Sequence, residues 1–120
     1  MFRFDSGRSM GAGSAAMGVH VRILALERET PGVTAEQFRP DLLRAEARRA
    51  WELYQTGVFR EMYFRQDCPE AVLILECANV DAANAALASL PLVQAGLIAF
   101  DVIPLKPYPG FARLFAGSEG

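Results

Sequence analysis

The sequence contains little of what metal and disulfide sites are built from. Its 120 residues include two cysteines and one histidine, His20. Two cysteines are too few for a disulfide framework, and Cys68 and Cys77 lack the spacing of a metal-binding pair. A single histidine has no partner cluster with which to bind a metal or haem. We therefore expect no metal site and no cofactor, and the scarcity of cysteine favours a reducing, cytoplasmic compartment.

Basic clusters and long apolar runs are also missing. The chain has 12 Lys and Arg against 14 Asp and Glu, a net charge of -2. Nucleic-acid binding needs a basic surface, so nucleic acid is not an expected partner. The longest apolar stretch, residues 90–105, is interrupted by Gln94 and Asp101 and falls short of the ~20 residues of a membrane span. We expect no membrane partner, and the lack of a Gly-rich phosphate loop argues against a nucleotide-dependent reaction.

The rest of the chain alternates between strand and helix patterns. Residues 1–18 are rich in Gly, Ser and Ala and lack periodicity, so we expect a disordered tail or an expression remnant, followed by one domain over residues 19–115. Strands are predicted at 19–28, 58–65, 71–78 and 97–105. Long helices are predicted at 41–55 and 81–90. This β-α-β-β-α-β order predicts an α+β fold of the ferredoxin-like type, with an antiparallel four-stranded sheet.

Local signals set the expected helix boundaries. Thr34 and Gln37 form a capping-box pattern, which starts a short turn. Pro40 should bend the chain before the first long helix, because proline disrupts a helix interior. Gly57 should end that helix, and Asp81 should cap the second.

Two of the predicted strands are apolar on both faces. In the segment AVLILE, Val72 and Ile74 alternate with Leu73 and Leu75. The last strand repeats this, with Ile98, Phe100 and Val102 on one face and Leu97, Ile103 and Leu105 on the other. Two helices cover one face of a sheet, so the other would remain a large apolar patch. We therefore predict a homodimer in which two sheets pack together into a shared barrel.

The segment LASLPLVQAGLIAFDVIPLKPYP resembles the dimeric α+β barrel proteins, and within them muconolactone isomerase-like proteins. The resemblance rests on Leu90, Pro91 and Leu92 after the second helix, and on GVFRE at the entry to the second strand. It covers roughly residues 19–109. The family includes isomerases, cofactor-free monooxygenases, haem-degrading enzymes and stress-responsive domains, so the resemblance implies the fold more strongly than one reaction.

Glu46 is the candidate catalytic residue. Its place on the first long helix resembles that of a helix carboxylate in muconolactone isomerases. An isomerase that moves a proton beside a carbonyl needs a base of raised pKa, and burial against a sheet raises the pKa of a carboxylate. The alternative is a solvated Glu46 paired with Arg44 or Arg49 on the helix surface.

Five residues are candidates for substrate binding: Trp51, Tyr54, Arg60, Tyr63 and His20. Tyr54 shares a helical stripe with Leu43, Ala47 and Ala50 and should meet the sheet, with Trp51 close by. Arg60 and Tyr63 fall on opposite faces of their strand, and an inward Arg60 would clamp a carboxylate. His20 could transfer protons near neutral pH. The alternatives are aromatic core packing, an outward arginine and a surface histidine.

Two functions remain open. One is an isomerase or cofactor-free oxygenase acting on a lactone-like or aromatic-derived molecule. The other is a non-catalytic homodimeric domain that binds a ligand or serves a stress response. An enzyme requires an ionisable group buried beside a cavity, whereas a binding domain requires only the cavity.

Overall fold

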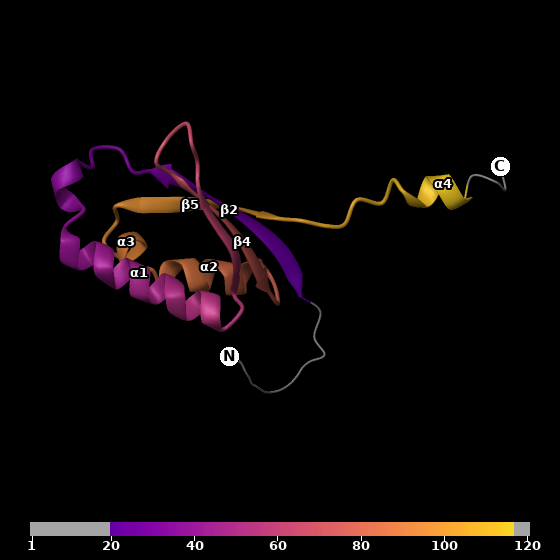
Figure 1. The fold of residues 1–120 in the computed structure, drawn as a ribbon, viewed down its shortest axis with the longest axis horizontal. Coiled ribbons are helices and arrows are strands. Elements are labelled where there is room, and N and C mark those ends of the chain that lie inside the picture. The colour runs from indigo at the N-terminus through magenta and orange to yellow at the C-terminus, as the bar shows by residue number, and fades with distance from the viewer. Residues whose placement is uncertain (1–19, 117–120) are drawn as a thin grey trace.

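A computed structural model describes residues 20–116, and these residues confirm the predicted ferredoxin-like α+β fold (Figure 1). The strands are β2 (Val21–Glu29), β3 (Phe59–Phe64), β4 (Ala71–Cys77) and β5 (Ile98–Pro104). They pair antiparallel in one sheet of order β3-β4-β2-β5. The helices are η1 (Ala35–Gln37), α1 (Pro40–Gln55), α2 (Val80–Ala88), α3 (Pro91–Gln94) and α4 (Ala112–Ala116). The predicted tail, residues 1–18, lies outside the described residues, and the domain boundaries stay a prediction.

Proline and glycine set the ends of α1. The Thr34 N–H donates to Gln37 Oε1 over 2.8 Å, and this capping box closes the separate turn η1. Pro40 then occupies the first position of α1, where its missing N–H removes no helix hydrogen bond. Gly57 follows the helix with φ of +86°, a conformation that costs glycine little. The predicted turn, long helix and glycine stop are all present.

The start of α2 differs from the prediction. Asn79, not Asp81, is the N-cap, and its side chain accepts a hydrogen bond of 2.8 Å from the Ala82 N–H. Asp81 lies in the first turn, where a negative charge still favours the helix. Pro91 follows the end of α2 as expected, and it also starts the short helix α3, which was not among the predicted elements.

The core lies between the sheet and helices α1, α2 and α3, which cover the same face (Figure 1). Ile23 and Leu75 are fully buried on that face, as is Phe59 at the start of β3. The buried side chains of the helices in this core include Leu53, Ala83 and Leu87. Short side chains in α2 suit close packing on the sheet.

The opposite side of the sheet, called here the open face, is apolar at its centre. Register and alternation place on it Leu24, Leu26, Val72, Ile74 and Ile103. Ion pairs flank this centre: Arg28 Nε lies 2.6 Å from Asp101 Oδ1, and Arg22 Nη2 lies 3.9 Å from Glu76 Oε1. Leu97 was expected on this side, but it is buried with Leu92 and Ile98 in a second core cluster. The sheet is therefore apolar on both faces, as the sequence indicated.

Beyond β5 the chain leaves the body of the domain. Figure 1 shows this segment running outward to α4 at its far end. Pro104, Pro107 and Pro109 lie along it, and prolines favour an extended backbone without donating to a sheet. Within residues 20–116, no helix combines the length and apolar character needed to cross a membrane.

Candidate functional site

Two cavities lie at the two ends of α1. The first, called here the acidic cavity, has a volume of about 330 Å³ and is lined by Glu27, Glu29, Thr30, Val33, Thr34, Ala35, Phe38, Pro69, Leu97 and Ile98. The second, called the aromatic cavity, has a volume of about 350 Å³ and is lined by Trp51, Tyr54, Gln55, Gly57, Phe59 and Arg60. Both volumes are in the range that accommodates a small molecule.

The acidic cavity combines an apolar wall with a polar edge. Val33 and Phe38 pack against Leu97 and Ile98, which belong to the second core cluster. The polar edge comes from the end of β2 and from the loop that leads into η1. A site of this kind provides apolar contact for a ligand body and a few polar groups to orient it.

Glu27 is a partly buried ionisable group of the cavity wall, on the core side of the sheet. It continues the alternation of Ile23 and Ala25, so its side chain projects toward the helices. The Ala71 N–H donates to Glu27 Oε1 over 2.8 Å. Burial raises the pKa of Glu27; the hydrogen bond from Ala71 opposes this, and the nearby charge of Glu70 adds to it.

Sequence reasoning did not single out Glu27, although a signal was present. A carboxylate two positions after Ala25, on the side of a strand that otherwise carries core residues, is unusual because burying a charge is costly. The alternation alone could have identified Glu27 as a polar residue that occupies a core-facing position for a reason other than packing.

Glu46 is partly buried on the face of α1 that meets the rest of the domain. Its Oε1 accepts a hydrogen bond of 2.9 Å from the Leu92 N–H in the first turn of α3. Burial raises the pKa of Glu46, the Leu92 N–H opposes this rise, and the charge of Glu27 adds to it. Arg49, the alternative partner, instead bonds Ser89 Oγ at 2.8 Å and Glu52 Oε1 at 2.9 Å.

Glu46 therefore adjoins the acidic cavity through its neighbours. Leu92, whose N–H it binds, packs with Leu97 and Ile98 of the cavity wall. Glu27 and Glu46 approach from the sheet and the helix respectively, and the charge of Glu27 raises the proton affinity of Glu46. Two carboxylates of raised pKa on either side of one helix–sheet space are typical of acid–base sites.

The face of α1 that was predicted to meet the sheet is wrong by about one residue along the helix. Leu43 is 44% exposed and Tyr54 is 49% exposed, whereas Leu53 is buried and Leu42 packs on the second core cluster. The inward stripe therefore contains Leu42, Glu46 and Leu53. A one-residue step rotates a side chain by ~100° around a helix, so this shift places Glu46 on the packed face of α1.

Trp51 and Tyr54 form a partly solvent-exposed aromatic pair over the aromatic cavity. Their ring centroids are 5.8 Å apart with an interplanar angle of 27°, and Trp51 is 57% exposed. Arg60 closes the cavity from β3, and its Nε lies 3.6 Å from Glu76 Oε1. The structure thus brings together three of the predicted binding residues, Trp51, Tyr54 and Arg60, away from Glu46.

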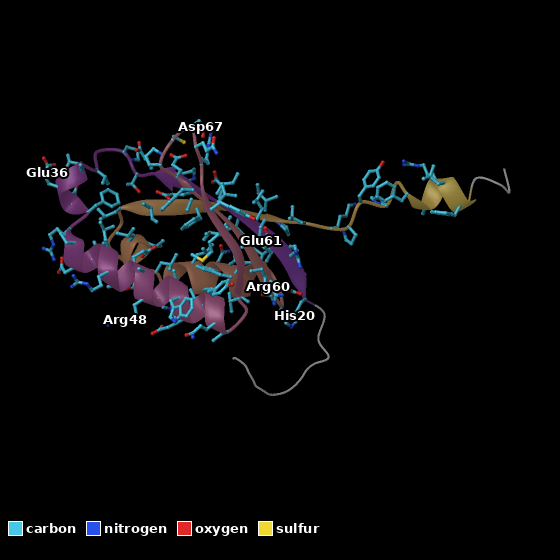
Figure 2. The ribbon with its side chains drawn as sticks, viewed as in Figure 1. His20, Glu36, Arg48, Arg60, Glu61 and Asp67 are labelled. Carbon is cyan, nitrogen blue, oxygen red and sulfur yellow. The ribbon has the colours of Figure 1, made fainter. Side chains whose placement is uncertain are left out.

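The other two predicted binding residues lie elsewhere. Tyr63 pairs with Val72 in register and lies on the open face, where its hydroxyl donates to Glu61 Oε1 over 2.7 Å. That hydrogen bond raises the pKa of the Tyr63 phenol. His20 is exposed just before β2, at the end of the sheet where β3 begins and where Arg60 lies (Figure 2). The strand irregularity between Phe59 and Glu61 breaks the simple alternation from which opposite faces were predicted for Arg60 and Tyr63.

Within residues 20–116, no group of three or more His, Cys, Asp or Glu side chains is arranged to hold a metal ion. Comparison with protein-family models finds none that matches the chain, and a search of curated proteins finds no match either. The chemistry of the two cavities is therefore what indicates a function.

Proposed function

We propose that the chain is a homodimeric protein that binds a small, largely apolar molecule in the acidic cavity and transfers a proton on it. The observation that carries the proposal is Glu27, a partly buried carboxylate of raised pKa that lines a cavity with an apolar wall. The substrate class is a lactone-like or aromatic-derived molecule, as the resemblance to muconolactone isomerase-like proteins implies. Isomerisation and cofactor-free oxygenation of such molecules both start by removing a proton.

In this proposal Glu27 is the base and Glu46 tunes it. A base of raised pKa binds the abstracted proton more strongly, and Glu27 is the more buried of the two carboxylates, Glu27 and Glu29, that line the cavity. When Glu27 accepts a proton, its repulsion of Glu46 disappears, which favours the protonated state of Glu27. The Thr34 hydroxyl lies in the same wall, where its O–H donates to Gln37 Oε1 over 3.4 Å. This moves the base role predicted for Glu46 to its neighbour on the sheet.

The homodimer forms through the open face in this proposal. Val72, Ile74 and the neighbouring apolar residues of β2 and β5 would otherwise remain in water. The acidic cavity lies on the other side of the sheet, so a partner on the open face leaves it accessible. Sedimentation of the full chain at micromolar concentration tests this part, and a stable monomer would contradict it.

The catalytic test uses α-angelica lactone, a lactone whose double bond moves into conjugation when a proton next to the carbonyl is removed. We expect the chain to accelerate this isomerisation, followed by ultraviolet absorbance, and Glu27→Gln to lower the rate by at least about 100-fold. The rate should rise with pH through a pKa above that of a free glutamate. Glu52→Gln, an exposed carboxylate of α1 outside both cavities, is the control and should retain the rate.

The second candidate is non-catalytic binding. Its support is that both carboxylates accept backbone N–H groups, from Ala71 and Leu92, which is also a structural role. Binding of α-angelica lactone, seen as shifts of the Val33 and Ile98 methyl signals by NMR, without acceleration of its isomerisation would favour this candidate. Absence of both binding and acceleration would contradict the choice of substrate class.

A further inference from the structure

The chain from Leu105 to Phe115, called here the arm, exposes its large apolar side chains. Tyr108 is 67% exposed, Phe111 66%, Leu114 74% and Phe115 79%. Figure 1 shows the arm extending from β5 away from the sheet and its helices. A row of aromatic side chains in water is costly, so a surface that covers them is expected.

The arm holds its own shape. The Leu105 N–H donates to the Arg22 carbonyl over 2.9 Å, next to the end of β5, and Pro107 and Pro109 then lack N–H groups to continue the sheet. Tyr108 and Phe111 pack edge to face with centroids 5.1 Å apart. The Tyr108 ring also lies over Gly110, where a Cβ atom would require the ring to move. The arm is therefore an extended projection with an aromatic end.

We propose that the arm packs on a second copy of this chain and completes the homodimer. This inference rests on the proposed dimer through the open face. Leu105, the first residue of the arm, follows Ile103 on that face, so the arm continues directly from the dimer surface. The prolines keep the arm extended, and it runs beyond the end of its own sheet (Figure 1).

Surface area supports a second copy as the occupant. A four-stranded face of this length has a planar area of about 400 Å². Three aromatic residues of the arm, exposed as given above, can remove a further ~300–500 Å² from water. The arm therefore adds substantially to the surface that a dimer through the open face would bury, toward the ~800 Å² per partner of a standard interface.

Charge also favours this occupant. Residues 20–104 contain eight arginines and twelve Asp and Glu, a net charge of -4. The arm contains Lys106 and Arg113 and no acidic residue, a net charge of +2. A basic arm is therefore complementary to the acidic body of another copy, which steers association between the two.

The test uses the full chain with Phe111→Ser and Phe115→Ser together. Sedimentation equilibrium should give a dissociation constant at least about 100-fold above wild type, because truncating an interface aromatic commonly weakens binding by about tenfold or more. Both residues lie outside the core, so thermal melting by circular dichroism should show a folded domain. Phe64→Ser, a 75% exposed phenylalanine on β3, is the matched control and should leave the constant unchanged.

The possible outcomes distinguish a failure of the proposed arm contact from a failure of the proposed dimer. A wild-type chain that is monomeric would overturn both. If wild type is a dimer and the arm variant has the same dissociation constant, the proposed role of the arm is wrong but the dimer stands. The same conclusion follows if Phe64→Ser weakens the dimer as much as the arm variant does. As a second measurement, a photoreactive benzoylphenylalanine at position 111 should join isotope-labelled chains to unlabelled ones, and crosslinks confined to single chains would also overturn the arm.

Discussion

Ile74 and Leu75 are neighbours on β4 whose side chains point to opposite faces of the sheet, so the same substitution at each position separates folding from assembly. Leu75 is fully buried beneath the helices. Ile74 lies on the open face and is partly exposed in the single chain. We expect Leu75→Asp to unfold the domain and Ile74→Asp to leave a folded monomer.

The magnitudes follow from burial. Shortening a fully buried leucine costs about 2–5 kcal/mol, and an unpaired buried carboxylate adds several more. Together these costs approach the ~5–15 kcal/mol that stabilise a domain. At Ile74 the monomer gains a partly solvated carboxylate at a cost of about 1 kcal/mol. In the dimer that carboxylate would face apolar side chains, and a penalty of ~2.7 kcal/mol raises the dissociation constant by about 100-fold.

Circular dichroism melting and sedimentation velocity, measured on the same samples, distinguish the two effects. Ile74→Asp should keep its helical signal and sediment as a monomer at concentrations where wild type is a dimer. Ile74→Val, which keeps the face apolar, is the control and should remain dimeric. If Ile74→Asp still sediments as a dimer, the open face is not the interface; if Leu75→Asp melts like wild type, the placement of β4 is wrong.

Three further predictions concern the carboxylates and a turn. Glu46→Ala should lower the free energy of unfolding by about 1–2 kcal/mol in urea titrations, because Leu92 loses its acceptor, whereas Glu46→Gln keeps it. Glu27 and Glu46 have raised pKa values in the folded state, so their stabilising contribution is complete below about pH 4 and is lost as pH rises through the folded pKa. The double Gln variant should therefore gain stability relative to wild type between pH 4 and 7, and an unchanged difference across that range would contradict the pKa directions. Gly57→Ala should cost about 1–2 kcal/mol because φ is +86° there, and an equal melting temperature would show that the turn relaxes.

The sequence predicted the order of elements well because local signals dominate it. Pro40, Gly57 and the apolar alternation of β4 each act through backbone geometry within a few residues. The N-cap of α2 was misplaced because Asn79 and Asp81 are both good caps, and their choice depends on where the preceding strand releases the chain. Local patterns therefore predict which helices and strands form more reliably than they predict the residue at which each one begins.

The candidate site was harder to predict because it depends on how α1 is rotated. Tyr54 and Leu53 are adjacent, and either could have met the sheet by composition. Tertiary contacts decide between them: Leu53 fills the main core, and Glu46 on the same side accepts the Leu92 N–H of α3. The Glu46–Leu92 contact joins residues 46 positions apart, and Leu53 packs with core residues from other elements; periodicity within one helix does not encode such contacts.

The two faces of β2 place assembly and chemistry on opposite sides of one strand. Leu24 and Leu26 face outward, whereas Ala25 and Glu27 face the helices. A partner on the open face therefore acts on the acidic cavity only through the backbone of this strand, and the Ala71 N–H fixes Glu27 from the neighbouring strand as well. Because backbone pairing holds β2 from both sides, the position of Glu27 is set within a single chain. In the proposed dimer, a partner on the open face would stabilise the sheet that carries Glu27, and the proposed proton transfer would need residues of one subunit alone.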